Sequence, residues 1–235
     1  MNKNIPHTVC LTFDFDALCV WLNKSETASP AMLSRGEFGA RVGIPRILAL
    51  LKTYEIPATF FIPGHTAESF PDSVEAILAA GHEVGHHGYG HENPSRQSPA
   101  EERRSLERGL EVLERFTGHP PLGYRSPSWD YSPATLPLLV EYGFLYDSSL
   151  FADDYHPYHP RIGDQVSAVV HHALHGFPGL CVRRQPGEIA GEVARFGDGR
   201  IACHALLRNP SRRAFRVQAG HPFHKSISSG ALFGR

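Results

Sequence analysis

Strand and metal-ligand patterns meet in one run of the chain, Gly81-His82-Glu83-Val84-Gly85-His86-His87-Gly88-Tyr89-Gly90-His91-Glu92-Asn93. The residues from His82 to His87 predict a short strand that runs into a glycine-rich loop. His87 and His91 stand four apart, so this loop is free to turn both imidazoles toward one point. Neutral imidazole is the commonest ligand for transition metals in proteins. The run therefore predicts a metal-binding loop, and the alternative is a polar loop whose histidines are merely solvated or hydrogen-bonded.

His86 competes with His87 for the role of ligand. Because successive side chains of a strand point to opposite faces, the two histidines should point in opposite directions. His87 lies where the predicted strand meets the loop, so we prefer it as the ligand.

A second informative stretch lies near the start of the chain and reads Thr8-Val9-Cys10-Leu11-Thr12-Phe13-Asp14-Phe15-Asp16. It predicts a buried strand that ends in two acids. Asp14 and Asp16 are two apart, so both point to the same side of an extended chain. Two carboxylates at a strand end are costly to desolvate unless a cation or hydrogen bonds compensate them. One acid as metal ligand and the other as proton acceptor would resolve that cost; the alternative is a pair of acids in a turn.

Composition sets the broad class. The chain has 235 residues, 41% of them hydrophobic, a formal net charge of −1 and a sequence pI near 6.9. This balance gives no reason to expect a nucleic-acid or membrane partner. The four cysteines have no CxxC spacing, and no signal-peptide-like apolar run opens the sequence, so we expect free thiols and a cytoplasmic location.

Strand and helix patterns alternate between residues 8 and 150. Predicted strands cover 8–16, 58–62, 82–87, 122–127 and 144–147, and predicted helices begin at Pro45, Pro71, Pro99 and Pro133. Residues 17–40 are expected to be a long loop that forms a wall of the pocket. The alternation predicts an α/β fold built from parallel βα units.

Chemically active side chains follow the carboxyl ends of these strands. They are Asp14, Asp16, His87, His91, Arg125 and Asp147. Barrels and open sheets of the α/β class place their active sites at this edge. We therefore expect these residues to share one site.

Several motifs together resemble those of the polysaccharide deacetylase (NodB-homology) superfamily. The residues that carry the resemblance are Thr12-Phe13-Asp14-Phe15-Asp16, Ser34-Arg35-Gly36, Pro63-Gly64-His65, the run from His87 to Pro94, Tyr124-Arg125-Ser126-Pro127 and Tyr146-Asp147-Ser148-Ser149. The intracellular branch is the most similar; it includes peptidoglycan deacetylase-like proteins, cyclic imide hydrolases and metal-independent allantoinase-like proteins. The resemblance covers about residues 7–165 and implies a distorted (β/α) barrel of the NodB-homology type.

The resemblance also implies roles for individual residues. Asp16, His87 and His91 would bind one divalent metal, with zinc as the first choice and manganese, cobalt or nickel as alternatives. Asp14 would be the general base, and Arg125 would pair with it and hold it ionised. The alternative for Arg125 is an ordinary surface arginine.

Further residues are candidates for supporting roles. Trp21, Tyr124 and Trp129 are candidate pocket residues, although packing is the alternative role for each of them. His65 and Glu83 are expected to hydrogen-bond around the metal ligands, with a purely structural role as the alternative.

The pattern changes after residue 165. Residues 165–235 contain 10 Lys and Arg against 3 Asp and Glu, whereas residues 1–164 contain 13 against 21. The resemblance calls for further strands and a late His-Pro motif whose histidine acts as general acid, and His221-Pro222 lacks the expected preceding strand. We therefore divide the chain into a catalytic domain at 1–165 and an atypical basic, Gly/His/Arg-rich tail at 166–235. Our hypothesis is that the tail is frameshifted or replaced and poorly ordered, which would leave the barrel incomplete at its C-terminal end.

Three functions agree with the sequence. The first is a metal-dependent hydrolase that removes an N-acetyl group from a carbohydrate such as peptidoglycan, or opens a small cyclic imide. The second is a metal-independent hydrolase of cyclic ureides, and the third is an inactive truncated remnant. A homo-oligomer is expected if the fold is complete.

Overall fold

Five short parallel strands follow one another across the central sheet. The computed structural model describes residues 10–23, 27–152, 160–162, 164–166, 171–172 and 181–183. In chain order and in spatial order the parallel strands are β1 (Leu11–Asp14), β2 (Ala58–Ile62), β3 (Glu83–His86), β4 (Gly123–Tyr124) and β5 (Tyr146–Asp147). Their sequential pairing, with a helical connection after each of the first four, confirms the predicted βα units.

The far edge of the sheet differs from the prediction of parallel strands only. Strand β9 (Cys181–Arg183) pairs antiparallel with β5, and β8 (His171–His172) pairs antiparallel with β9. Strands β6 (Arg161–Ile162) and β7 (Gln165–Val166) form a separate antiparallel pair. The sheet is thus an incomplete, curled (β/α) barrel, as the sequence predicts.

Strand β2 lies at the centre of the well-formed part of the sheet. All five of its residues are buried, which is typical of a parallel strand that is covered on both faces. Phe60 points to one face and stacks on Phe13 of β1 with ring centroids 5.1 Å apart. Phe61 points to the other face, toward the site described below.

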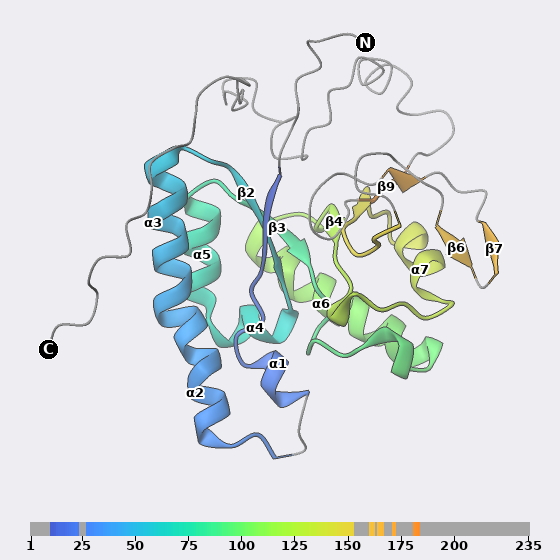
Figure 1. Ribbon diagram of the computed structural model, residues 1–235, viewed down its shortest axis with the longest axis horizontal. Coiled ribbons are helices and arrows are strands. Elements are labelled where there is room, and N and C mark those ends of the chain that lie inside the picture. The colour runs from blue at the N-terminus through green and yellow to red at the C-terminus, as the bar shows by residue number, and fades with distance from the viewer. Residues whose placement is uncertain are drawn as a thin grey trace, which may run out of the picture.

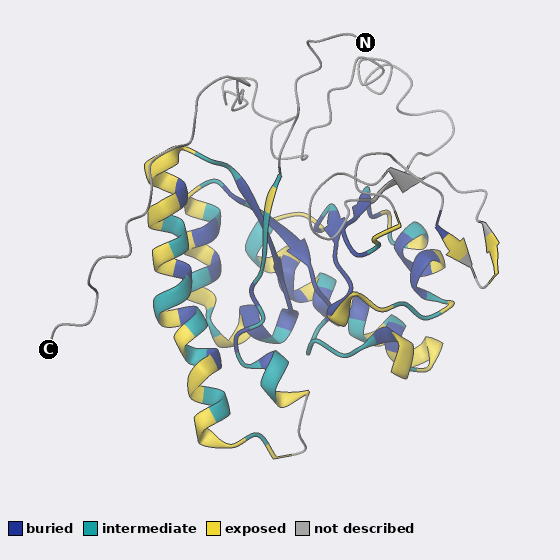
Figure 2. Cartoon of the chain, in the orientation of Figure 1, coloured by how far each residue is buried: buried dark blue, intermediate teal, exposed yellow. Residues whose placement is uncertain are grey.

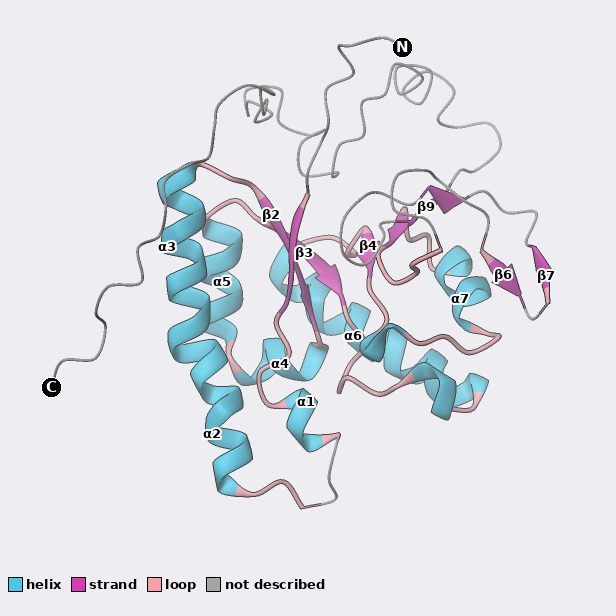
Figure 3. Cartoon of the chain, viewed as in Figure 1, coloured by secondary structure: helices cyan, strands magenta, loops and turns pink. Residues whose placement is uncertain are grey.

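Three helices cover the outer face of the sheet (Figure 1). They are α3 (Ile44–Tyr54), α5 (Pro71–Ala79) and α6 (Pro99–Thr117), and α3 and α5 lie side by side along it (Figure 3). The main apolar core fills the space between sheet and helices and includes Phe15, Ile44, Leu51, Phe60, Ile62, Val74, Ile77, Val84, Val112 and Leu113. Exposed residues lie on the outer sides of these helices, whereas strands β2, β4 and β5 are buried (Figure 2).

Helix α6 begins and ends where the sequence predicts. Ser98 and Glu101 form the capping box, in which each side chain accepts from the other residue's backbone N–H. Gly118 ends the helix at φ 74°, a left-handed conformation that suits glycine.

Residues 17–40 do not form the long loop that the sequence analysis predicts. They contain α1 (Cys19–Leu22) and α2 (Pro30–Phe38), and a π-helical turn at Gly39–Gly43 joins α2 to α3. Ser29 caps α2 by accepting from Met32 N. A Cβ atom at Gly36 would lie 2.6 Å from the carbonyl oxygen of Ala17, so this glycine lets the helix cross the chain just after Asp16. The Ser34-Arg35-Gly36 motif is therefore helical, and its glycine has a packing role.

The remaining helices pack nearer the site and the far edge. Helix α4 (Gly64–Ser69) follows β2, and short 3₁₀ turns lie at Pro94–Arg96 and Pro127–Trp129. Helix α7 (Thr135–Glu141) forms a second small core with α6, which contains Leu106, Tyr124, Leu138, Leu139 and Phe144. Where the chain is described, no helix is both long and apolar enough to span a bilayer.

The predicted boundary at residue 165 falls within the β6–β7 pair. Of the tail at 166–235, the structure describes Val166 and the two strands β8 and β9. The proposed late motif, His221-Pro222, lies outside the described residues. The division into catalytic domain and tail therefore stays a prediction.

Candidate metal and catalytic site

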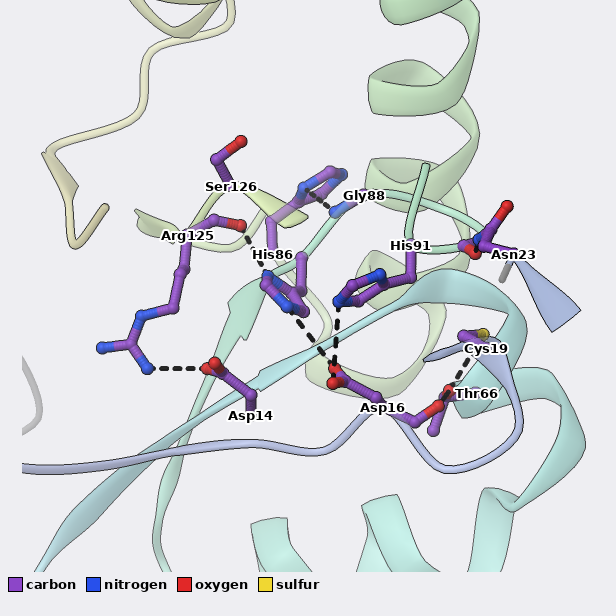
Figure 4. A network of polar contacts seen from close by, with 12 residues as sticks. Asp14, Asp16, Cys19, Asn23, Thr66, His86, Gly88, His91, Arg125 and Ser126 are labelled. Atoms are coloured by element: carbon purple, nitrogen blue, oxygen red, sulfur yellow. Dashed lines mark hydrogen bonds and ion pairs between the residues drawn. The ribbon is translucent and has the colours of Figure 1, made fainter. Parts of the chain in front are cut away.

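The predicted site residues meet at the carboxyl ends of the parallel strands. Asp14 ends β1 and Asp16 follows two residues later. His87 and His91 come from the loop after β3, and Arg125 comes directly after β4. Their side chains gather above the sheet edge, with Asp16 facing His91 and Asp14 facing Arg125 (Figure 4).

Asp16, His87 and His91 form one cluster of potential metal ligands. Asp16 Oδ1 lies 3.4 Å from His87 Nε2, and Asp16 Oδ2 lies 3.6 Å from His91 Nε2. Each residue offers one ligand atom, and these atoms all lie within 4.8 Å of one another. The cluster is largely shielded from solvent, since the side chains of His87 and Asp16 are 2% and 22% exposed.

A backbone carbonyl fixes the orientation of His87. The Nδ1 atom of His87 lies 2.7 Å from the carbonyl oxygen of Arg125. Because that oxygen only accepts, Nδ1 carries a proton, and Nε2 is the ring nitrogen that faces Asp16. Metal-binding histidines are commonly held in this way by a hydrogen bond at the other ring nitrogen.

The donor set fits a divalent cation. Among the residues that the structure describes, Asp16 Oδ1 is a buried oxygen with no hydrogen-bond partner. It lies 3.4 Å from His87 Nε2, and a buried carboxylate oxygen without a partner is unfavourable unless a cation or a proton compensates it. Burial and the neighbouring His87 lower the pKa of His91, which disfavours a proton there. One carboxylate and two imidazoles match the ligand preferences of zinc and similar ions.

The main chain of Asp16 is anchored from α1 and α4. Thr66 Oγ1 donates to the Asp16 carbonyl oxygen at 2.6 Å, and Cys19 N donates to the same oxygen at 2.9 Å. Thr66 Oγ1 also lies 3.2 Å from Cys19 Sγ. Burial raises the pKa of the Cys19 thiol to about 11, so this thiol stays protonated and inert at neutral pH.

His65 acts on the site only through its neighbours. Its Nδ1 atom lies 3.5 Å from Cys19 Sγ and 3.4 Å from Ser69 Oγ. Its backbone N–H donates to the Tyr89 carbonyl oxygen at 2.8 Å and so holds the histidine loop. In the described region no contact between the His65 side chain and a metal ligand is seen, so its predicted supporting role stays a prediction.

A second part of the site is the buried ion pair of Asp14 and Arg125. Arg125 Nη1 donates to Asp14 Oδ1 at 2.6 Å, and the guanidinium carbon lies 4.2 Å above the ring of Phe61. Three more guanidinium hydrogen bonds go to Thr12 Oγ1, Ser148 Oγ and the Ser148 carbonyl oxygen. Arg125 is buried and hydrogen-bonded to the site, which excludes the alternative of an ordinary surface arginine.

Asp147 holds the chain beside Arg125. Its carboxylate accepts from Ser149 N at 3.0 Å and from Ser149 Oγ at 2.7 Å, and Ser149 Oγ in turn accepts from Ser126 N at 2.7 Å. Burial raises the pKa of Asp147 to about 6. The network joins the segments after β4 and β5, from which Arg125 and Ser148 extend.

The structure does not place Tyr124 in the pocket. Tyr124 pairs with His86 across β3 and β4, so both side chains lie on the face opposite to Arg125. The Tyr124 ring stacks on His86 with centroids 5.5 Å apart and contacts Phe144 in the second core. The prediction of a pocket role was wrong because Arg125, one residue later, already occupies the site face.

The prediction that Glu83 supports the metal ligands was also wrong. Glu83 begins β3, at the opposite end of the strand from His87. Its Oε2 atom accepts from Thr59 Oγ1 at 2.7 Å inside the sheet, and burial raises its pKa. Closeness in sequence does not bring Glu83 near the site, because an extended strand separates its two ends by about 3.3 Å for each residue.

His86 and His87 point in opposite directions, as predicted. His86 Nε2 lies 3.0 Å from the Leu106 carbonyl oxygen, and Gly88 N donates to His86 Nδ1 at 3.1 Å. Complete burial lowers the pKa of His86 to about 4, so it is neutral. His86 therefore belongs to the packing of β3 against α6.

The two tryptophans lie on separate elements. Trp129 lies after β4, is 48% exposed and has φ 51°. Its ring contacts the ring of Phe151 edge-on, with the centroids 6.2 Å apart. Trp21 lies in α1, and the guanidinium carbon of Arg35 lies 5.7 Å from its ring centroid. Their predicted contact with substrate stays a prediction.

Sequence reasoning missed Thr12, Thr66 and Ser148 as parts of the site. Thr12 precedes Asp14 by two positions, so the alternation of a strand places both on one face. Ser148 lies within the recognised Tyr146-Asp147-Ser148-Ser149 motif. Thr66 had no such signal, because helix α4, which carries it, was not predicted.

Comparison with known proteins now identifies the family. Residues 2–146 match the polysaccharide deacetylase family, and the chain belongs to that family. A peptidoglycan deacetylase of Helicobacter pylori is 45% identical over 157 residues, which are 66% of this chain and 54% of that protein. This finding confirms the resemblance that the sequence motifs indicate.

Solved structures agree with this assignment. A Mycobacterium smegmatis protein that has been assigned to the polysaccharide deacetylases has 39% identity and a TM-score of 0.62, over 71% of this chain and 58% of that one. The PuuE allantoinase has 28% identity and a TM-score of 0.58, over 68% of this chain and 62% of that one. The chain spans about half the length of the Helicobacter pylori relative.

Proposed function

We propose that this protein is a metal-dependent hydrolase that removes N-acetyl groups from a peptidoglycan-type or related carbohydrate. One observation carries the proposal. The buried, unpartnered Oδ1 of Asp16 and the Nε2 atoms of two histidines converge beside the Asp14–Arg125 ion pair. A cation site next to a fixed carboxylate is one arrangement that catalyses hydrolysis of an amide.

Asp16, His87 and His91 would hold the cation, and zinc is the first choice. A bound divalent ion supplies Lewis acidity toward a carbonyl oxygen and lowers the pKa of water. Three protein ligands leave coordination positions open for other molecules. Manganese, cobalt and nickel are alternatives, because the same ligand types accept them.

Asp14 would accept the proton of the attacking water. Arg125 engages Asp14 Oδ1, which leaves Oδ2 as the oxygen for proton transfer. The contacts of Arg125 with Thr12 and Ser148 fix the direction of the guanidinium, which in turn fixes the Asp14 carboxylate. Water then adds to the acetyl carbon, the proton accepted by Asp14 passes to the leaving nitrogen, the C–N bond breaks, and acetate and an amine are released.

The family supports the class of substrate. The Helicobacter pylori relative is a peptidoglycan deacetylase. The family match over residues 2–146 includes Asp14, His87 and Arg125. Trp21 and Trp129 are the candidate surfaces for a sugar ring, because aromatic faces pack well against apolar faces of ligands. Trp129 is the stronger candidate, since it lies in the segment that follows Arg125 and is exposed.

The direct test is acetate release by the purified full chain from N-acetylated glycan fragments. We expect activity in the presence of zinc, loss after treatment with a chelator, and recovery when zinc is restored. Activity that ignores the chelator would contradict metal dependence. Absence of activity with every metal would support the inactive remnant and contradict the proposal.

A metal-independent hydrolase of cyclic ureides is the second candidate. The structural similarity to the PuuE allantoinase favours it. The unpartnered carboxylate oxygen of Asp16 opposes it, because that atom lacks a partner unless a cation is bound. If the protein opens the ring of allantoin and a chelator does not stop the reaction, this second candidate is supported.

A cytoplasmic location and self-association remain predictions. Cys19 is a buried free thiol, in agreement with a reducing compartment. Cell fractionation and sedimentation of the purified chain would test the two predictions separately.

A further inference from the structure

The loop that carries His91 has an unusual backbone. His91 has φ 63°, a left-handed conformation that residues other than glycine seldom adopt. Gly88, three residues earlier, is also left-handed at φ 72°. A residue kept in such a conformation needs neighbours that enforce it, and strain of this kind concentrates at functional sites.

One carboxylate lies inside the turn of this loop. Glu92 Oε2 accepts from Gly90 N at 2.8 Å and from Ser105 Oγ of α6 at 2.8 Å. Ser105 Oγ also accepts from Tyr89 N at 3.3 Å. The backbone N–H groups of Tyr89 and Gly90, just before His91, are therefore held by the hydrogen-bonded side chains of Ser105 and Glu92.

The turn is closed tightly around this carboxylate. A Cβ atom at Gly90 would lie 2.8 Å from Glu92 Oε1, so only glycine fits there without displacing Glu92. On the outer side, Gly64 N donates to the Gly88 carbonyl, and Asn23 Nδ2 donates to the Gly90 carbonyl. The backbone before His91 is thus fixed from both sides, and Glu92 is its inner support.

We propose that Glu92 and Ser105 are positioning residues that hold His91 in its left-handed conformation and thereby set the affinity of the cation site. The inference rests on the proposed function, because it assumes that His91 is a ligand. Neither residue touches the ligand atoms of the cluster in the described structure. Their effect passes through the backbone of Tyr89 and Gly90, which places the His91 imidazole opposite Asp16 Oδ2.

Zinc titration calorimetry on the metal-free full chain tests the proposal. Glu92→Ala and Ser105→Ala should each weaken zinc binding by roughly 10- to 100-fold, the usual loss when a group that orients a ligand is removed. Ser105→Thr restores a hydroxyl at the same place and should bind zinc like the wild type. Glu111→Gln, an exposed change on the same helix, is the matched control and should also bind like the wild type.

Hydrogen exchange of residues 87–93 in the metal-free protein gives a second readout. The Tyr89 and Gly90 amides should exchange faster in Glu92→Ala than in the wild type, and the Tyr89 amide faster in Ser105→Ala. Unchanged exchange, or faster exchange with unchanged zinc affinity, would overturn the proposal. Failure of the wild type to bind zinc would overturn the proposed function as well, whereas failure confined to the variants concerns the positioning role alone.

Discussion

The two halves of the site are built in opposite ways. Around Asp16, the ligand atoms of three residues face one another, and a buried oxygen lacks a hydrogen-bond partner in the described structure. Around Asp14, the Arg125 guanidinium meets Asp14, Thr12 and Ser148, so charge and hydrogen bonds are satisfied. On the proposed function, a cation would complete the first half, whereas the Asp14 carboxylate of the second half already has the Arg125 guanidinium as its partner.

The sheet gives a reason for this difference. Asp14, Asp16 and the histidines follow β1 and β3, which pair in register with the fully buried β2. Arg125 and Ser148 follow the two-residue strands β4 and β5, where little strand pairing fixes the chain. Side-chain hydrogen bonds through Asp147 and Ser149 fix these two segments instead. The partners of Asp14 thus come from short strands, and side-chain hydrogen bonds hold those partners in place.

The largest expected effect follows from removing the base in the satisfied half. Asp14→Asn should lower kcat by about 10²- to 10⁴-fold, the usual contribution of a positioned general base. Zinc affinity should be largely retained, because Asp14 lies outside the ligand cluster. Acetate release and calorimetry on the same preparation would check both statements. If Asp14→Asn lowers zinc affinity as much as it lowers kcat, the two halves of the site do not have separate roles.

Breaking the ion pair from the other side should destabilise the fold. Arg125→Met leaves the Asp14 carboxylate partly buried without its cation, and loss of one partner of a buried pair costs about 3–5 kcal/mol. Urea unfolding measures the change. Arg103→Met breaks an exposed pair with Glu141 and is the matched control, with an expected cost of about 1 kcal/mol or less. A similar small cost for Arg125→Met would contradict the account.

The Asp147 network predicts a pH dependence of stability. Burial raises the pKa of Asp147 from 3.8 to about 6, so between these values the native state binds more protons than the unfolded state. The free energy of unfolding should therefore fall as pH rises from about 4 to about 6, by up to about 3 kcal/mol, and level off above. Asp147→Asn should remove this slope. If the free energy of unfolding changes with pH in the same way in the wild type and in Asp147→Asn, the prediction is refuted.

The smallest effect is expected at Trp129. Trp129→Ala removes an exposed edge-on contact with Phe151, which is worth about 0.5–1.5 kcal/mol. The variant should melt slightly earlier and show a raised KM for glycan fragments with kcat little changed. Trp129→Phe keeps an aromatic face and should retain most of the binding. An unchanged KM in Trp129→Ala would exclude Trp129 from the substrate surface.

Much of the fold follows from local sequence signals. The apolar run of β2 and the capping box of α6 identify both elements correctly, because each is decided by adjacent residues. Helix α2 was missed because Gly36 disfavours a helix locally, whereas tertiary contact with Ala17 requires the glycine. Helix α1 has only four residues, too few to show a helical pattern.

The site shows a similar limit. The motif residues Asp14, Asp16, His87, His91 and Arg125 come together as the strand-end argument predicts. Tyr124 and Glu83 were misplaced because neighbours in sequence were taken as neighbours in space. Strand alternation and the length of β3 correct both assignments.

Zinc binding by three forms of the metal-free full chain tests the central claim most directly. Calorimetry should find one high-affinity zinc in the wild type and in Asp14→Asn, and none of comparable affinity in Asp16→Asn. This result would confirm that the two carboxylates, two residues apart, have different roles. Equal zinc binding by Asp14→Asn and Asp16→Asn, or no binding by the wild type, would contradict it.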